Sequence, residues 1–123
     1  MLPASHNRAY QDFLTLLTEF KDCLNSPEGK GVIFTSDNKF QLLQQYFAAN
    51  IANLESKDIE ISIIARWQSV QIEIKREFKL LTTDILFLAS ARRDSTRTKR
   101  IESISDRITK LIGYCQILLK KEN

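Results

Sequence analysis

The sequence predicts an all-α protein, an up-and-down antiparallel four-helix bundle whose long third and fourth helices form a hairpin. Glycine and proline, which most tight turns require, number only three and two among 123 residues. Four segments repeat apolar residues at spacings of three and four, the pattern of one helix face. The connection between the third and fourth segments is short, and short connections make consecutive helices antiparallel neighbours.

Length and composition predict one helical domain over residues 1–123. Hydrophobic residues make up 43% and charged residues 27%, which excludes a disordered chain, a collagen-like chain and a disulfide scaffold. No run of about 18 apolar residues occurs, so we expect no membrane span. The only cysteines are Cys23 and Cys115, and no secretory signal is visible at the start. We therefore expect a cytoplasmic protein with two free thiols.

The first helix is predicted over about residues 6–25, with Ser5 as a candidate N-cap. Its apolar stripe consists of Tyr10, Phe13, Leu17, Phe20 and Leu24. Residues 26–36 form a linker with two of the three glycines. Within it, residues 32–34 form either a short extended piece or, as we favour, an apolar plug over the bundle end, because a lone strand lacks hydrogen-bond partners.

The second helix is predicted over residues 37–54, with Ser36 or Asp37 as N-cap. Its apolar residues are Phe40, Leu43, Phe47, Ile51 and Leu54. The following break at residues 55–58 contains neither glycine nor proline. We expect a turn there, capped by Ser56 or Asp58, but a continuous helix is the alternative.

The third helix is predicted over residues 59–92. Its seam reads Ile64, Trp67, Gln71, Ile74, Phe78, Leu81, Ile85 and Leu88. Gln71, the one polar seam residue, either sets the helix register or oligomeric state or lies where the seam is exposed to solvent. Residues 80–88 are apolar on several sides at once, so this end should lie at the bundle centre or in a dimer interface.

The fourth helix is predicted over residues 95–120, with Asp94, Ser95 or Thr96 as N-cap. Its seam is again spaced by three and four, and consists of Ile101, Ile104, Ile108, Leu111, Cys115 and Leu118.

The sequence offers little catalytic chemistry. His6 is the only histidine and stands near a terminus. The two cysteines fall on apolar faces of separate helices, as core residues do. Glu73 and Glu77 share a helix face surrounded by cations, which is typical of a solvated face. We therefore expect no catalytic residue, no metal ligand and no cofactor-binding residue, and so no enzyme.

Positive charge collects near the C-terminal end. Residues 1–91 contain 9 Lys/Arg against 11 Asp/Glu, whereas residues 92–123 contain 9 against 4. Five of the nine residues from 92 to 100 are basic, namely Arg92, Arg93, Arg97, Lys99 and Arg100. Three interpretations stay open: a solvated face, a surface for an acidic protein partner, and a nucleic-acid surface. Nucleic acid is the least favoured, because no aromatic residues interleave with the basic ones.

Two stretches resemble the cyanobacterial heterocyst-frequency control protein family, PatD. Residues 80–92 match the family pattern L-L-x-x-D-x-x-F-L-x-x-A-R. Ile104-Ser105-Asp106-Arg107-Ile108 follows, and then the pair Tyr114-Cys115, as in the family. The resemblance covers about residues 66–119.

The resemblance implies a non-enzymatic, cytoplasmic regulator of heterocyst differentiation that acts on the cell-division protein FtsZ. We place the expected contact on Arg92, Arg93, Arg97, Lys99 and Arg100, with Arg107 as a further candidate. A carboxylate at Asp84, on the apolar end of the third helix, needs a partner, and Arg107 or Lys110 could supply it. These matching polar residues could therefore lock the helix pair rather than bind a partner. Association with nucleic acid and a structural homodimer remain the alternative functions.

Overall fold

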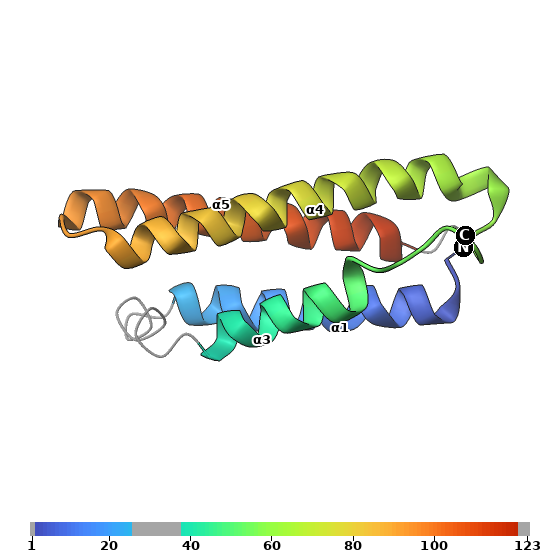
Figure 1. Cartoon of the computed structure of the whole chain (residues 1–123), viewed down its shortest axis with the longest axis horizontal. Coiled ribbons are helices and arrows are strands. Elements are labelled where there is room, and N and C mark those ends of the chain that lie inside the picture. Colours follow the sequence, from blue (N-terminus) through green and yellow to red (C-terminus); the bar gives the residue numbers. More distant parts are fainter. Residues whose placement is uncertain (1, 26–37, 121–123) are drawn as a thin grey trace.

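The computed structural model describes residues 2–25 and 38–120, and over this range the chain is an all-α, up-and-down four-helix bundle (Figure 1). Helix α1 spans Ala4–Asn25 and helix α3 spans Asn38–Tyr46. A π-helical turn, η1, continues α3 over Phe47–Ile51. Helices α4 and α5 span Ile61–Ser90 and Asp94–Leu119. The predicted fold class is confirmed.

Consecutive helices alternate in direction, and α4 and α5 form the predicted long hairpin (Figure 1). Helix α5 has the most extensive contacts, with α4 on one side and α1 on another. Helix α3 and η1 pack along α1. The α4–α5 turn therefore lies at one end of the bundle, and the start of α1 lies at the opposite end.

Side chains of the apolar seams fill the space between the helices. Tyr10, Phe13, Leu81 and Ile108 are among the side chains with no exposed surface. Phe78 of α4 stacks on Phe47 of η1, with ring centroids 4.1 Å apart and planes 9° from parallel. This stack joins the α3–η1 segment to the α4–α5 hairpin.

The helix bounds differ from prediction by one to three residues. Helix α1 begins at Ala4, so Ser5 lies inside it. The second helical segment ends at Ile51 instead of residue 54, and residues 52–60 separate it from α4, which confirms the break. Helix α4 is two residues shorter at each end than the predicted 59–92, and α5 starts and stops one residue before the predicted 95–120.

The predicted caps of the last two helices are wrong. Glu60 occupies the N-cap position of α4 and Arg93 that of α5, and neither forms a side-chain cap hydrogen bond. Instead, a backbone hydrogen bond closes the first turn of each helix. The Ile63 amide donates to the Glu60 carbonyl at 3.0 Å, and the Arg97 amide donates to the Arg93 carbonyl at 2.9 Å. The predicted linker at 26–36, its plug at 32–34 and the caps at 36 and 37 lie outside the described residues.

A buried chain of hydrogen bonds connects α1, α4 and η1. The Trp67 indole Nε1 donates to the Tyr10 hydroxyl at 2.8 Å, and that hydroxyl donates to Gln71 Oε1 at 2.6 Å. Gln71 Nε2 donates to the carbonyl oxygen of Ile51 at 2.7 Å. Gln71 is only 4% exposed, so of its two predicted placements the exposed one is wrong. Its amide instead bonds the last carbonyl of η1 and ties three elements together.

His6 is also part of the core, although it stands near the chain terminus. Its Nε2 donates to the carbonyl oxygen of Glu55 at 2.8 Å, and its ring meets the edge of Trp67 with centroids 5.9 Å apart. The imidazole therefore connects α1 to the segment between η1 and α4.

Candidate partner-binding surface

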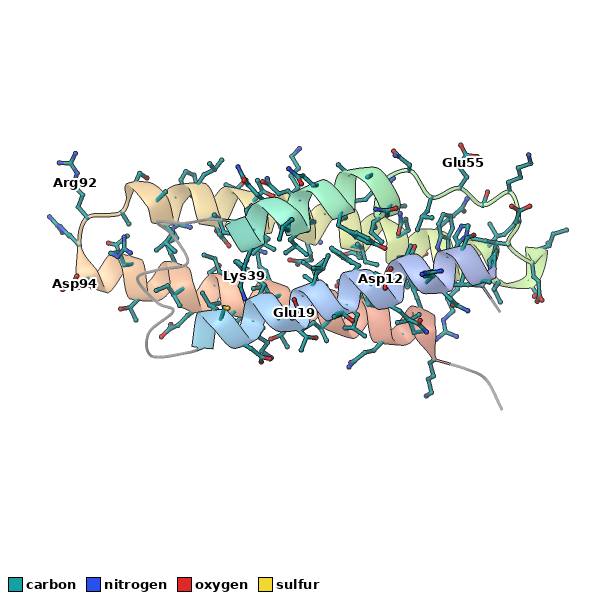
Figure 2. The ribbon with its side chains drawn as sticks, turned by 90° about the horizontal axis from the view of Figure 1, so that it is seen from below. Asp12, Glu19, Lys39, Glu55, Arg92 and Asp94 are labelled. Carbon is teal, nitrogen blue, oxygen red and sulfur yellow. The ribbon has the colours of Figure 1, made fainter. Side chains whose placement is uncertain are left out.

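The α4–α5 turn carries the predicted basic residues at one end of the bundle. Arg92, Arg93 and Lys99 are exposed. None of the three side chains has an ion-pair or hydrogen-bond partner among residues 2–25 and 38–120. Figure 2 shows Arg92 projecting beyond the turn, at the end of the molecule opposite Glu55. These three cations are available to a partner.

Arg97 is partly buried and turns back toward the end of α4. Its Nη1 lies 3.5 Å from the Leu88 carbonyl oxygen and 3.4 Å from that of Ala91. The last carbonyls of a helix lack partners within the helix and carry partial negative charge. Arg97 therefore stabilises the C-terminal end of α4.

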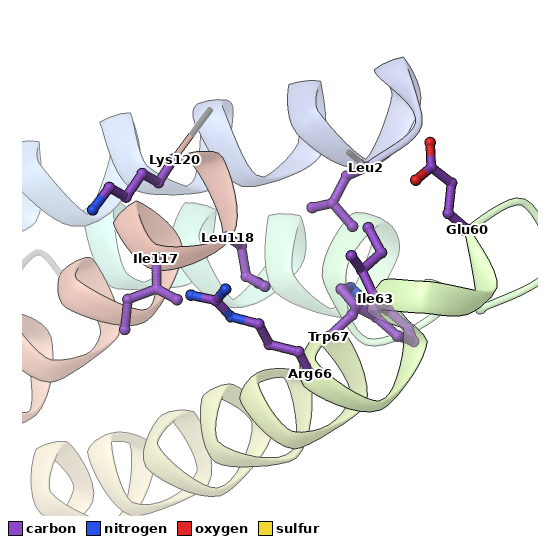
Figure 3. A pocket seen from close by; sticks show the side chains of 8 residues that line it. All are labelled: Leu2, Glu60, Ile63, Arg66, Trp67, Ile117, Leu118 and Lys120. Carbon is purple, nitrogen blue, oxygen red and sulfur yellow. The ribbon is translucent and has the colours of Figure 1, made fainter. Parts of the chain in front are cut away.

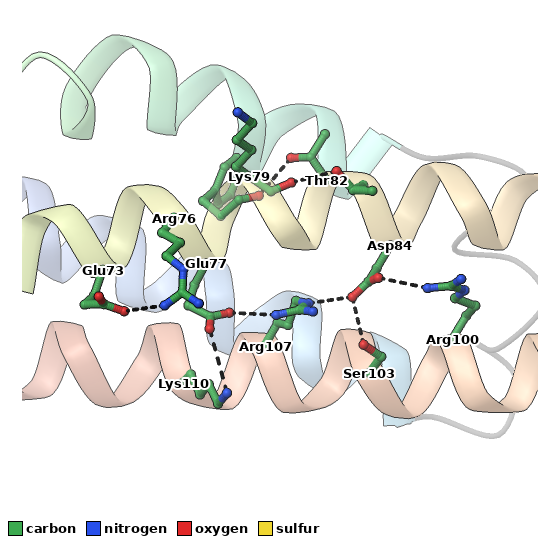
Figure 4. A network of polar contacts seen from close by, with 12 residues as sticks. Glu73, Arg76, Glu77, Lys79, Thr82, Asp84, Arg100, Ser103, Arg107 and Lys110 are labelled. Atoms are coloured by element: carbon green, nitrogen blue, oxygen red, sulfur yellow. Dashed lines mark hydrogen bonds and ion pairs between the residues drawn. The ribbon is translucent and has the colours of Figure 1, made fainter.

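Arg107 lies between two buried carboxylates of α4 (Figure 4). Its Nε donates to Asp84 Oδ2 at 2.6 Å, and its Nη1 donates to Glu77 Oε2 at 3.1 Å. Burial alone would lower the pKa of Arg107, but hydrogen bonds to Asp84 and Glu77 and their negative charges outweigh it and raise the pKa. The guanidinium is held in its charged form as an internal connection between α4 and α5.

The same network includes three further residues of α5. Ser103 Oγ donates to Asp84 Oδ2 at 2.8 Å, and Arg100 Nη1 to Asp84 Oδ1 at 3.2 Å. Lys110 Nζ lies 3.7 Å from Glu77 Oε1. Of the two predicted partners of Asp84, Arg107 is confirmed, whereas Lys110 pairs with Glu77 instead.

The prediction that Glu77 belongs to a solvated face is wrong, since the residue is only 4% exposed. Glu73 does form the ordinary exposed pair, with Arg76 at 3.2 Å. A sequence signal for the network exists: Glu77 and Asp84 are seven residues apart, as are Arg100 and Arg107. Side chains seven apart return to nearly the same helix face, so an antiparallel hairpin can bring both pairs together.

Two large apolar side chains are exposed near the end of α4, just before the α4–α5 turn. Leu86 is 65% exposed and Phe87 49% exposed, so of the two predicted placements of this end the bundle centre is wrong for these two residues, and the dimer interface stays a prediction. The guanidinium carbon of Arg100 lies 4.7 Å from the centroid of the Phe87 ring, within the range of a cation–π interaction. Leu81 and Leu88 of the same segment have no exposed surface.

The predicted site residues thus divide by their roles. Arg92, Arg93 and Lys99 face solvent, whereas Arg97, Arg100 and Arg107 bind other parts of the hairpin. All six carry the same positive charge in the sequence. The packing of α5 on α4 decides which of them face solvent and which bind within the hairpin.

A separate cavity of about 350 Å³ opens at the other end of the bundle (Figure 3). Leu2, Ile63, Trp67 and Leu118 contribute its apolar wall, and Arg66 and Glu60 lie at its edge. It contains no histidine or cysteine, and no group of His, Cys, Asp or Glu suited to a metal ion exists among the described residues.

The two cysteines lie on different helices. Cys115 is buried in α5, and burial raises the pKa of its thiol to about 12. Cys23 of α1 is half-buried.

Within residues 2–25 and 38–120, no helix is both long and apolar enough to cross a membrane.

Comparison of the chain with family models, with curated proteins and with solved structures found no match.

Proposed function

We propose that this protein is a non-enzymatic regulator of heterocyst differentiation in cyanobacteria, acting in the cytoplasm through contact with the cell-division protein FtsZ and modulating its assembly. The sequence resemblance over residues 66–119 supports the family and partner. The structural observation that carries the proposal is the group of three exposed cations, Arg92, Arg93 and Lys99, at the α4–α5 turn, whose side chains have no ion-pair partner among residues 2–25 and 38–120. A fixed positive surface of this kind accelerates association with an acidic protein and discriminates against basic ones.

The hairpin suits this task because it is fixed from inside. Arg107 and Asp84 connect α4 to α5 below the turn, and Arg97 binds the last carbonyls of α4. The exposed cations therefore project from a structured support, so little ordering of the backbone is needed when a partner binds. In this proposal Arg92, Arg93 and Lys99 contact the partner, while Arg97, Arg100 and Arg107 position the surface.

A homodimer is the second candidate, and the exposure of Leu86 and Phe87 favours it. Apposed apolar side chains would be removed from water in such a dimer. The adjacent Arg92 and Arg93 oppose it, since the two copies would bring like charges together. Nucleic acid remains an alternative ligand for the same cations, and a steep fall of affinity with salt in a gel-shift titration would identify it.

Co-sedimentation with FtsZ from the same organism, with and without GTP and at two salt concentrations, tests the proposal. We expect the wild-type protein to pellet with polymer and to do so less at high salt. The variant Arg92→Glu/Arg93→Glu/Lys99→Glu should lose pelleting. The control Arg8→Glu/Lys57→Glu/Lys75→Glu reverses three exposed charges elsewhere, with the same change in net charge, and should retain it.

Two outcomes would count against the proposal. If wild-type protein neither pellets nor changes the polymer yield, direct FtsZ binding is excluded. If both triple variants lose pelleting equally, overall charge rather than the α4–α5 turn is responsible.

A further inference from the structure

We propose that the α4–α5 turn presents a composite surface, and that its occupant is an acidic protein segment that also carries apolar side chains. We call Leu86, Phe87, Arg92, Arg93 and Lys99 the tip surface. The inference rests on the proposed function for its biological setting, and adds to it the chemistry of the segment that binds.

The apolar part of the tip surface consists of two consecutive residues. Leu86 and Phe87 are 65% and 49% exposed, and as consecutive residues of α4 they are about 100° apart around its axis, both on the side away from the buried Leu81 and Leu88. The other exposed large apolar side chains of the described residues, Leu42, Ile61, Ile72 and Ile117, stand singly in the sequence. Isolated exposed apolar side chains are ordinary, whereas neighbouring ones rimmed by charged residues are typical of an interaction site.

The Phe87 ring is held in place before any partner arrives. The Arg100 guanidinium lies over it, 4.7 Å from the ring centroid, and also pairs with Asp84 at 3.2 Å. Asp84 is in turn fixed by Arg107 and Ser103. An aromatic side chain restrained in this way loses less rotamer freedom on binding than a free one. Arg100 is thus a positioning residue for the tip surface.

The charges around this apolar pair select the occupant. Residues 92–100 contain five basic side chains and one acidic residue, Asp94. A second copy of the chain would place these cations against each other, and a purely acidic ligand would leave Leu86 and Phe87 exposed to water. A segment with both carboxylates and apolar side chains satisfies both parts of the surface.

Titration of the ¹⁵N-labelled full chain in two-dimensional NMR tests this inference directly. The probes are three synthetic peptides of equal length: one with alternating acidic and Leu/Phe positions, one with serine replacing Leu/Phe, and one with lysine replacing the acidic residues. We expect the acidic–apolar peptide to shift amides of residues 84–100 and to bind about tenfold more tightly than the serine peptide, as burial of one large apolar side chain predicts. The lysine peptide should not bind.

Variants separate the two parts of the surface. Leu86→Ser/Phe87→Ser should remove the tenfold difference between the first two peptides but keep residual, salt-sensitive binding of both. Leu42→Ser/Ile72→Ser removes two other exposed apolar side chains, 56% and 62% exposed, and should leave the difference unchanged. Circular dichroism and melting of each variant check folding, and Phe87→Leu, which keeps an apolar side chain, should retain most of the difference.

Equal affinity for the acidic–apolar and serine peptides would overturn the inference, as would amide shifts centred away from residues 84–100. Tighter binding of a 20-base-pair duplex than of any peptide would assign the surface to nucleic acid. A dimer in light scattering that Leu86→Ser/Phe87→Ser dissociates would assign it to a second copy.

The FtsZ co-sedimentation and the peptide titration can fail independently of each other. If Leu86→Ser/Phe87→Ser co-sediments with FtsZ as well as wild type does, while the triple charge variant does not, the composite surface is wrong and the proposed function stands. If wild-type protein does not co-sediment but the acidic–apolar peptide binds as expected, the surface stands and its partner is a different acidic protein.

Discussion

Tyr10 shows how one hydroxyl can specify the packing of three elements. It accepts from Trp67 Nε1 and donates to Gln71 Oε1, and Gln71 then bonds the Ile51 carbonyl. Burial is the main cause that raises the pKa of Tyr10 well above its usual value, so the phenol stays protonated and able to donate. Every fully buried side-chain nitrogen or oxygen of the described residues has a hydrogen-bond partner. Such groups specify one arrangement, because any other leaves them unpaired in the core.

The variant Tyr10→Phe should have a free energy of unfolding lower by about 1–3 kcal/mol, since the Trp67 indole N–H and the Gln71 amide oxygen both lose the Tyr10 hydroxyl as a hydrogen-bond partner. Urea denaturation measures the change. Tyr114→Phe is the matched control, because the hydroxyl of the partly buried Tyr114 has no hydrogen-bond partner in the described part of the chain. An equal unfolding free energy for Tyr10→Phe and wild type would show that the buried chain does not stabilise the protein.

At the scale of elements, the pairing of α4 with α5 depends on a polar face as well as on the apolar seam. Glu77 and Asp84 on α4 face Arg100, Ser103, Arg107 and Lys110 on α5. Sliding one helix past the other by a turn would separate these groups and leave carboxylates buried without cations. The seam alone permits such a slide, because its apolar residues recur every three or four residues, which is about one turn.

Removing the central cation of this face should therefore be costly. We expect Arg107→Met to destabilise the protein by about 3–5 kcal/mol, because each of two buried carboxylates loses its shortest charged hydrogen bond while the apolar stem is kept. Asp84 then keeps Arg100 and Ser103, and Glu77 keeps Lys110. Arg76→Met is the control. Arg76 Nη1 lies 3.2 Å from Glu73 Oε2 on the surface, close to the 3.1 Å between Arg107 Nη1 and Glu77 Oε2, and loss of this exposed pair should cost less than about 1 kcal/mol.

Thermal and urea unfolding of both variants provide the comparison. The combined replacement Glu77→Leu/Asp84→Leu/Arg107→Met should recover much of the stability lost in Arg107→Met, since an apolar group of similar size removes the unpaired charges. Similar small losses for Arg107→Met and Arg76→Met would mean that the network is dispensable.

At the scale of the whole molecule, the stability of the bundle depends on two buried groups, Tyr10 and Cys115, remaining protonated. Cys115 and Tyr10 both have a pKa raised by burial, that of Cys115 from 9.0 to about 12. Below pH 9 the thiol is protonated in both folded and unfolded chains, so its full contribution to stability is present. Above pH 9 the unfolded chain releases the proton while the folded chain keeps it, and stability falls until the pH reaches about 12.

We expect the unfolding free energy to fall by at least about 1 kcal/mol between pH 8 and pH 10. Urea denaturation at several pH values measures this slope, and Cys115→Ala should show a shallower one whatever its stability at neutral pH. Alkylation by iodoacetamide at pH 8.5 gives an independent readout, with Cys115 modified only after unfolding. Rapid modification of Cys115 in the native protein would contradict this assignment.

The sequence by itself determined the fold class and most of the core, because apolar periodicity follows directly from helix geometry. It also determined the number and order of the helices within residues 2–25 and 38–120 and the break before α4. It also indicated the pairing of Asp84 with Arg107. Helix ends were misplaced by one to three residues, since backbone turns rather than side-chain caps enclose the starts of α4 and α5.

Only the tertiary structure decided which of six similar cations face solvent, that Glu77 is internal, and that Leu86 and Phe87 remain exposed. The physical reason is that exposure depends on the rotation and register of α5 on α4. A pattern within one helix reports its own faces, but the neighbour that covers a face comes from elsewhere in the chain.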